Sequence, residues 1–168
     1  MQKTLLVADD DPSIRSSLEK VLQAAGYRVL LAADGAEAAD GLKTQSVDLV
    51  VLDLNLPAPG GFELLDLIRE QHPTVSVLVL TGLLAQCEPG ALAGADFLIE
   101  KPPDVAVLLQ QVELLLNESE EQRAHRRATQ ASRASAGSTS TNPSARLFSI
   151  GTRLSSGIVS AAAAHQAQ

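Results

Sequence analysis

Acidic, hydroxyl and ammonium side chains stand where apolar runs of the chain end. They are Asp9, Asp10, Asp11, Asp53, Thr81 and Lys101. Carboxylates gathered in one place repel each other, and a divalent cation is a common way to relieve that repulsion. Carboxylate oxygens are hard ligands that suit Mg²⁺, which keeps several waters and binds one or two carboxylates together with phosphate. We therefore expect a magnesium site if the fold brings these side chains together.

The hydroxyl of Thr81 and the ammonium of Lys101 add a second function to this acidic group. Beside a bound metal they would contact an anion, and metal, amine and hydroxyl together neutralise phosphoryl oxygens. A carboxylate in the same set can act as the nucleophile that accepts the group. The set therefore indicates transfer of a phosphoryl group onto or off a carboxylate.

Short apolar runs alternate with longer amphipathic ones over the first 117 residues. We expect strands over residues 4–8, 27–33, 47–52, 75–80 and 97–100. We expect helices over residues 12–25, 34–46, 61–71, 83–93 and 104–117, the fourth being weak because it contains a proline. Continuous apolar strands alternating with helices indicate a parallel sheet covered on both faces. Sites in such sheets form beyond the carboxyl ends of the strands, where the six side chains stand.

Several segments together resemble the receiver domain of response regulators in two-component signalling. They are LLVADDDPSIR, DLVVLDLNLPAPGGFELL, VLVLTG and GADFLIEKPP, in this order and spacing. The resemblance covers residues 1–117. It implies a flavodoxin-like, doubly wound, five-stranded parallel sheet in the order 2-1-3-4-5 with five helices. It also implies a stand-alone response regulator that accepts a phosphoryl group from a histidine kinase or phosphotransfer protein and then binds a downstream partner.

The resemblance assigns roles by position. Asp53 matches the phosphoacceptor, Thr81 the hydroxyl that moves toward the phosphoryl group, and Lys101 the lysine that pairs with it. Asp10 matches the carboxylate that binds Mg²⁺ directly, and Asp9 the neighbour that acts mainly through water. The implied metal ligands are therefore Asp9, Asp10, Asp53 and the backbone carbonyl of Asn55.

Two positions near the lysine concern the signalling surface. Pro102 stands where the family often has a cis peptide bond, which X–Pro bonds tolerate. The family's switch aromatic lies three residues before the lysine, where this chain has Leu98 with Phe97 beside it. Either Phe97 takes that role through a shifted strand, or the usual aromatic rotation is absent.

Charge and hydropathy limit the partners. The 168 residues carry a net charge of -7, which argues against a nucleic-acid-binding surface. No apolar stretch approaches the ~20 residues of a membrane helix, so we expect no membrane partner and a cytoplasmic location. We expect a monomer or weak homodimer.

The chain after residue 117 is of a different kind, because it has six arginines and only three acidic residues. Residues 118–134 are polar on all sides and indicate a solvated helical extension or a linker. Residues 135–168 are of low complexity and indicate a largely disordered tail. Within the tail, residues 147–159 form an amphipathic stripe, which is either a docking segment or merely a tail with some apolar residues.

Other interpretations stay open at this point. Asp9, Asp10 and Asp11 precede Pro12 and could simply cap a helix. An aspartate-nucleophile phosphatase would need a second acid two residues after its nucleophile, where this chain has Asn55, so we expect no enzyme of that class. A receiver-fold module that binds partners without phosphorylation is the main alternative.

Overall fold

The computed structural model describes residues 2–82, 92 and 94–136. These residues belong to one compact unit, residues 1–138. Of the helix expected over residues 83–93, only Leu92 is among the described residues. The tail after residue 136, with its stripe at 147–159, lies outside the described residues.

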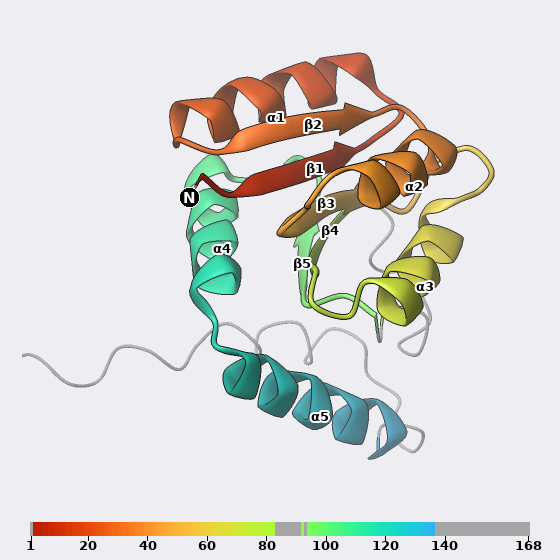
Figure 1. Ribbon diagram of the computed structural model, residues 1–168, viewed down its shortest axis with the longest axis vertical. Helices are drawn as coiled ribbons and strands as arrows, with labels where there is room; N and C mark the ends of the chain where they lie inside the picture. The colour runs from red at the N-terminus through yellow and green to blue at the C-terminus, as the bar shows by residue number, and fades with distance from the viewer. Residues whose placement is uncertain (1, 83–91, 93, 137–168) are drawn as a thin grey trace, which may run out of the picture. The chain divides into compact units, whose positions relative to one another are not determined.

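Five parallel strands form one sheet in the order β2-β1-β3-β4-β5, as the sequence predicts (Figure 1). The central strands β1, β3 and β4 are buried along their whole length, which explains their continuous apolar sequences. The fold is therefore the expected flavodoxin-like, doubly wound one. The strands are β1 (Thr4–Ala8), β2 (Arg28–Ala32), β3 (Leu49–Asp53), β4 (Ser76–Thr81) and β5 (Phe97–Glu100).

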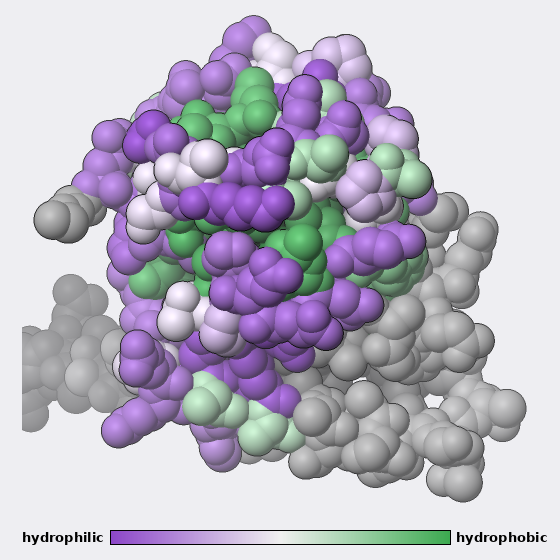
Figure 2. Space-filling view, turned by 45° about the vertical axis from the view of Figure 1, so that its right-hand side comes forward, coloured by the Kyte–Doolittle hydropathy of each residue, from purple (hydrophilic) through white to green (hydrophobic). Residues whose placement is uncertain are grey.

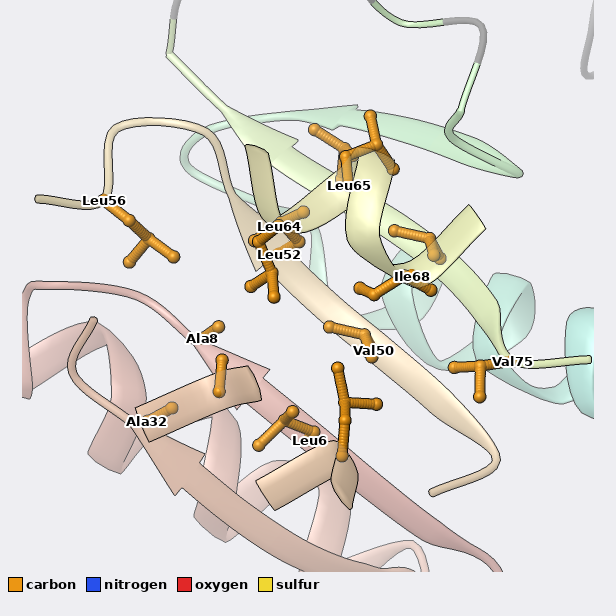
Figure 3. Packing of buried hydrophobic residues seen from close by; sticks show 14 of the residues in the cluster. Leu6, Ala8, Ala32, Val50, Leu52, Leu56, Leu64, Leu65, Ile68 and Val75 are labelled. Atoms are coloured by element: carbon orange, nitrogen blue, oxygen red, sulfur yellow. The ribbon is translucent and has the colours of Figure 1, made fainter. Parts of the chain in front are cut away.

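Helices cover both faces of the sheet (Figure 1). Alternate residues of each strand point to opposite faces, so the core has two clusters. One cluster packs under α2 and α3, and Figure 3 shows Leu64, Leu65 and Ile68 of α3 beside Val50 and Leu52 of β3. The other packs under α1 and α4. The helices are α1 (Pro12–Ala24), α2 (Gly35–Thr44), α3 (Gly61–Gln71), α4 (Val105–Asn117) and α5 (Glu120–Ala136).

The surface is mainly polar. Figure 2 shows a face on which hydrophilic residues surround a smaller apolar area. In the part of the chain that the structure describes, no helix has the length and apolar character needed to span a bilayer.

Helix α5 differs from the solvated extension of the preceding helix that the sequence suggested. α4 ends at Asn117, and Glu118 is extended with φ -63° and ψ 134°. A new helix then begins, because the Oγ of Ser119 accepts from the N–H of Gln122 and the Gln122 side chain accepts from the N–H of Ser119. This reciprocal capping is a helix-start signal that the sequence carries at residues 119–122. Three arginines of α5 are also half-buried rather than solvated.

The buried carboxylate of Asp96, just before β5, ties α5 to the sheet. It accepts hydrogen bonds from the N–H of Val77 at 2.8 Å, from Arg126 at 2.8 Å and from Arg127 at 2.9 and 3.0 Å. Burial alone would raise the pKa of Asp96, but the hydrogen bonds from Arg127 and Arg126 hold that pKa below its usual 3.8. The carboxylate therefore stays ionised although its side chain is fully buried.

This lowered pKa predicts a loss of stability in acid. A carboxylate with a lower pKa in the folded state stabilises the protein above its unfolded pKa, and loses that effect as pH falls through the folded pKa. We expect wild type to be more stable than Asp96→Asn at neutral pH, by a margin that shrinks below about pH 4. Urea unfolding of both proteins from pH 7 to pH 2 measures the margin. Asp40→Asn, at a side chain that is 79% exposed, is the control, and a margin that stays constant to pH 2 would contradict the assignment.

Candidate functional site

The predicted site residues meet at the carboxyl edge of the sheet. Asp53 and Thr81 are the last residues of β3 and β4, and Asp9 and Lys101 directly follow β1 and β5. Sheet hydrogen bonds continue into both of these flanking residues. The N–H of Asp9 donates to Ala32 at 3.2 Å, and the N–H of Lys101 donates to Thr81 at 3.1 Å. The sheet itself therefore sets the positions of these side chains.

The ammonium of Lys101 bridges two buried carboxylates. Its Nζ lies 2.6 Å from Oδ2 of Asp9 and 2.6 Å from Oδ2 of Asp53. Asp9 and Asp53 are 1% and 3% exposed. Burial alone would lower the pKa of Lys101, but its hydrogen bonds to Asp53 and Asp9 and their charges raise that pKa. The lysine is therefore held charged between the two acids.

Local hydrogen bonds fix how the two acids are turned. Oδ1 of Asp53 accepts from the N–H of Asn55 at 3.1 Å, and Oδ1 of Asp9 accepts from the N–H of Asp11 at 2.9 Å. Each carboxylate therefore has one oxygen on a backbone amide and the other on Lys101. The carboxylates are thus oriented by the chain that carries them.

The helix-capping interpretation of the first acidic run applies to its third member. Asp11 is the N-cap of α1, and its side chain accepts from the N–H of Ser13 at 2.8 Å. This bond lowers the pKa of Asp11 more than the other interactions do. Asp9 instead turns inward to Lys101, so Asp9 and Asp11 have different contacts.

Arg15 supports the same loop, and the sequence analysis did not single it out. Its Nη1 donates to the backbone carbonyl of Asp9 at 2.6 Å. Because Arg15 stands in the first turns of α1, this bond ties the helix start to the loop that carries the acids. The only sequence signal is its place four residues after the N-cap Asp11, within the segment DDDPSIR.

Three carboxylates could hold a metal ion. Asp9, Asp10 and Asp53 each offer an oxygen, and the three atoms lie within 4.8 Å of one another. Asp10 is exposed whereas the other two are buried, so the cluster has one side open to water. With one ammonium against three carboxylates, the cluster keeps an excess of negative charge. This donor set fits a hard cation such as Mg²⁺, which prefers oxygen ligands and retains waters.

Gly61 lets the start of α3 lie directly against the end of β3. A Cβ at this position would collide with the backbone of Asp53 and Leu54. Any larger residue would therefore push the helix away from the strand end or displace Asp53. The glycine-rich sequence after the strand thus has a steric role in shaping the site.

The structure distinguishes the two residues near the switch-aromatic position. β5 pairs with β4 in regular order, with Phe97 opposite Leu78 and Leu98 opposite Val79. Phe97 packs against the core cluster under α1 and α4, whereas Leu98 packs against the cluster on the other face. Phe97 therefore does not replace an aromatic at Leu98 by a shift of the strand. The Lys101–Pro102 peptide bond is cis, as the sequence suggested.

A family model described as the response regulator receiver domain matches residues 5–113. The chain belongs to this family. Its fold and the placement of its strand-end acids agree with that membership.

Curated relatives of the receiver include regulators and a sensor kinase. It is 38% identical over 118 residues to the response regulator MprA of Mycobacterium sp. (strain KMS), covering 69% of this chain and 51% of the relative. It is 35% identical over 122 residues to the alkaline phosphatase synthesis transcriptional regulatory protein PhoP of Bacillus subtilis (strain 168), covering 71% and 51%. It is also 34% identical over 116 residues to the CAI-1 autoinducer sensor kinase/phosphatase CqsS of Vibrio cholerae, covering 66% and 17%. The chain thus spans about half the length of the two regulators and 17% of the length of the sensor kinase.

Solved receiver structures match a large part of the chain. A CheY-like receiver domain protein from Methanospirillum hungatei JF-1 matches with a TM-score of 0.65 and 28% identity, covering 74% of this chain and 99% of that one. The response regulator TrrA of Thermotoga maritima, solved in complex with Mg(2+)-BeF, matches with a TM-score of 0.62 and 30% identity, covering 68% and 99%.

Proposed function

We propose that this receiver accepts a phosphoryl group on Asp53 from a histidine kinase or phosphotransfer protein, with Mg²⁺, and signals through phosphorylation-dependent partner binding. One observation carries the proposal. The charged Lys101 bridges Asp53 and Asp9 at 2.6 Å each, at the strand edge where Thr81 also ends β4. A carboxylate, an ammonium and a hydroxyl group at one edge of the sheet support the proposal.

Asp53 is the nucleophile in the proposed transfer. One of its carboxylate oxygens forms a bond to phosphorus while the phosphorus–nitrogen bond of the donor phosphohistidine breaks. The electron pair of that bond leaves with the imidazole nitrogen. Lys101 and the hydroxyl of Thr81 then donate hydrogen bonds to phosphoryl oxygens, as positioned donors do in phosphoryl transfer generally.

The acidic cluster would hold Mg²⁺ in this scheme. Asp10, Asp53 and the backbone carbonyl of Asn55 would bind it directly, and Asp9 mainly through water. Bound Mg²⁺ would neutralise charge on the phosphoryl oxygens. Support comes from the three carboxylate oxygens within 4.8 Å and from the relative TrrA, whose structure contains Mg(2+)-BeF.

The rest of the proposal concerns the whole chain. Residues 1–117 are the receiver, residues 118–134 follow it, and residues 135–168 form a tail that could dock on a partner. The receiver acts in the cytoplasm, as a monomer or weak homodimer, and has no enzymatic activity beyond losing its own phosphoryl group. A receiver-fold interaction module without phosphorylation is the second candidate, because Leu98 stands in place of the switch aromatic.

Incubation with acetyl phosphate tests the proposal. We expect a single phosphoryl adduct by intact-mass spectrometry in the presence of Mg²⁺, and none when EDTA removes the metal. A rapidly hydrolysed adduct would escape detection, so Mg²⁺-dependent binding of beryllofluoride is measured in parallel. Absence of both the adduct and beryllofluoride binding would reject phosphorylation and leave the interaction module as the better account.

A further inference from the structure

Over its residues 120–129, helix α5 is attached to the receiver by arginines and not by an apolar face. Among its residues 120–129 none is fully buried, and those turned toward the domain include Arg123, Arg126 and Arg127, at helical spacing. Arg123 donates to the carbonyl of Thr74, and Arg127 donates to the carbonyls of Pro73 and Val75. Together with the bonds to Asp96, these are charge-assisted contacts, which depend strongly on geometry.

Several charged side chains crowd around Asp96. Arg126 and Arg127 both bond its carboxylate, and Arg126 also bonds Glu118. Arg69 of α3 stands close to this group, and its pKa is lowered first by burial and then by the charge of Arg127. Asp66 also acts on Arg69, so three guanidinium groups meet three carboxylates here. Arg126 and Arg127 share the single carboxylate of Asp96, and the repulsion between them opposes docking, so the closed position rests on the exact alignment of the bonds to Asp96.

Asp96 and the proposed phosphorylation site lie at opposite ends of the strand pair β4 and β5. Asp96 directly precedes β5, and Lys101 directly follows it. Val77, whose N–H donates to Asp96, lies near the start of β4, and Thr81 ends that strand. At the usual rise per residue, the five steps from Asp96 to Lys101 span roughly 16 Å.

We propose that α5 is a latch, closed in this structure by Arg126 and Arg127 on Asp96, and that phosphorylation of Asp53 opens it. The inference rests on the proposed function and adds an output to it. The partner of the site is then helix α5 of the same chain.

The coupling runs along β4 and β5. Without a phosphoryl group, Lys101 bonds Asp9 and Asp53. A phosphoryl group on Asp53 gives Lys101 and Thr81 new oxygen partners, so the ends of both strands shift toward it. The bonds of Val77, Arg126 and Arg127 to Asp96 then lose alignment, and repulsion among the arginines favours release. Because binding free energies are reciprocal, an open latch must also favour the phosphorylated form.

Amide hydrogen exchange of the full chain tests the latch. Exchange is measured by mass spectrometry with and without beryllofluoride and Mg²⁺. We expect the amides of residues 120–136 to exchange at least about fivefold faster with beryllofluoride bound, the lower end of usual coupling factors. The amides of α2, on another part of the domain, serve as an internal control. Unchanged exchange in α5 despite bound beryllofluoride overturns the latch and leaves the proposed function intact.

A variant tests the reciprocal effect. Arg127→Ala opens the latch, so it is expected to bind beryllofluoride at least about fivefold more tightly than wild type. Arg126→Lys keeps the charge but loses the planar fork, and is a milder second variant if the first fails to fold. Lys43→Ala removes a surface cation that is 60% exposed and should bind as wild type does. Unchanged affinity in both arginine variants contradicts the coupling. A wild type that neither binds beryllofluoride nor forms the phosphoryl adduct contradicts the proposed function itself.

Discussion

Replacing Asp53 by asparagine is expected to abolish the phosphoryl adduct, with a loss of at least about a hundredfold. The amide has nearly the same shape as the carboxylate, and its oxygen can still accept the N–H of Asn55. It lacks the charge and the nucleophilic oxygen that the proposed attack on phosphorus requires. Lys101 keeps Asp9 as a partner, so the domain should still fold. Intact-mass spectrometry after acetyl phosphate and Mg²⁺ measures the adduct.

Two companion variants show which property was lost. Asp10→Asn removes an exposed acid of the cluster but not the nucleophile, so it should regain the adduct at higher Mg²⁺ concentration. Asp40→Asn, an exposed acid on α2, should behave as wild type. If the Asp53→Asn protein still forms the adduct at the wild-type rate, another side chain accepts the phosphoryl group and the assignment of Asp53 is wrong.

Truncating Asp96 to alanine is expected to lower the free energy of unfolding by about 3–5 kcal/mol. The change removes the fully buried carboxylate that Arg126 and Arg127 bond and leaves two cations facing one another. The N–H of Val77 also loses its side-chain acceptor. Urea unfolding at neutral pH, followed by far-ultraviolet circular dichroism, measures the loss.

Asp48 offers a matched control for this substitution. It precedes β3 as Asp96 precedes β5, and it accepts the N–H of Thr4 at 2.9 Å from the neighbouring strand. Its single cation is Lys3, and its side chain is 29% exposed. Asp48→Ala should therefore cost only about 1 kcal/mol. Equal losses for the two variants would show that the arginine contacts of Asp96 contribute little.

The site was predictable because the strand pattern and the topology place it. Once the apolar runs are recognised as parallel strands, their carboxyl ends must meet at one edge, and the side chains there can be read from the sequence. The structure brings Asp9, Asp10, Asp53 and Lys101 together in this way. What the sequence could not show is that the lysine contacts both acids, since that depends on side-chain conformation.

The attachment of α5 was not predictable by the same reasoning. An arginine-rich stretch without an apolar face usually indicates a solvated helix. Its partner Asp96 lies 30 residues before Arg126, and the segment GADFLIE shows no sign that this acid is buried in an ion pair. The position of Phe97 needed the structure as well, because only the observed pairing of β5 with β4 shows which face each residue occupies.

Asp48 and Asp96 also help to set the register between parallel strands. Parallel strands are joined by long crossovers, so no tight turn sets their register as it does in a hairpin. The N–H of Asp48 donates to the carbonyl of Thr4 on the neighbouring strand, and the N–H of Thr4 donates to the carboxylate of Asp48. Asp96 forms the same two bonds with Val77. A slip by one residue would break both bonds and turn the core side chains to the wrong face. An aspartate just before a strand can therefore fix the register of a parallel strand pair. A designer of parallel sheets could use it in place of a turn.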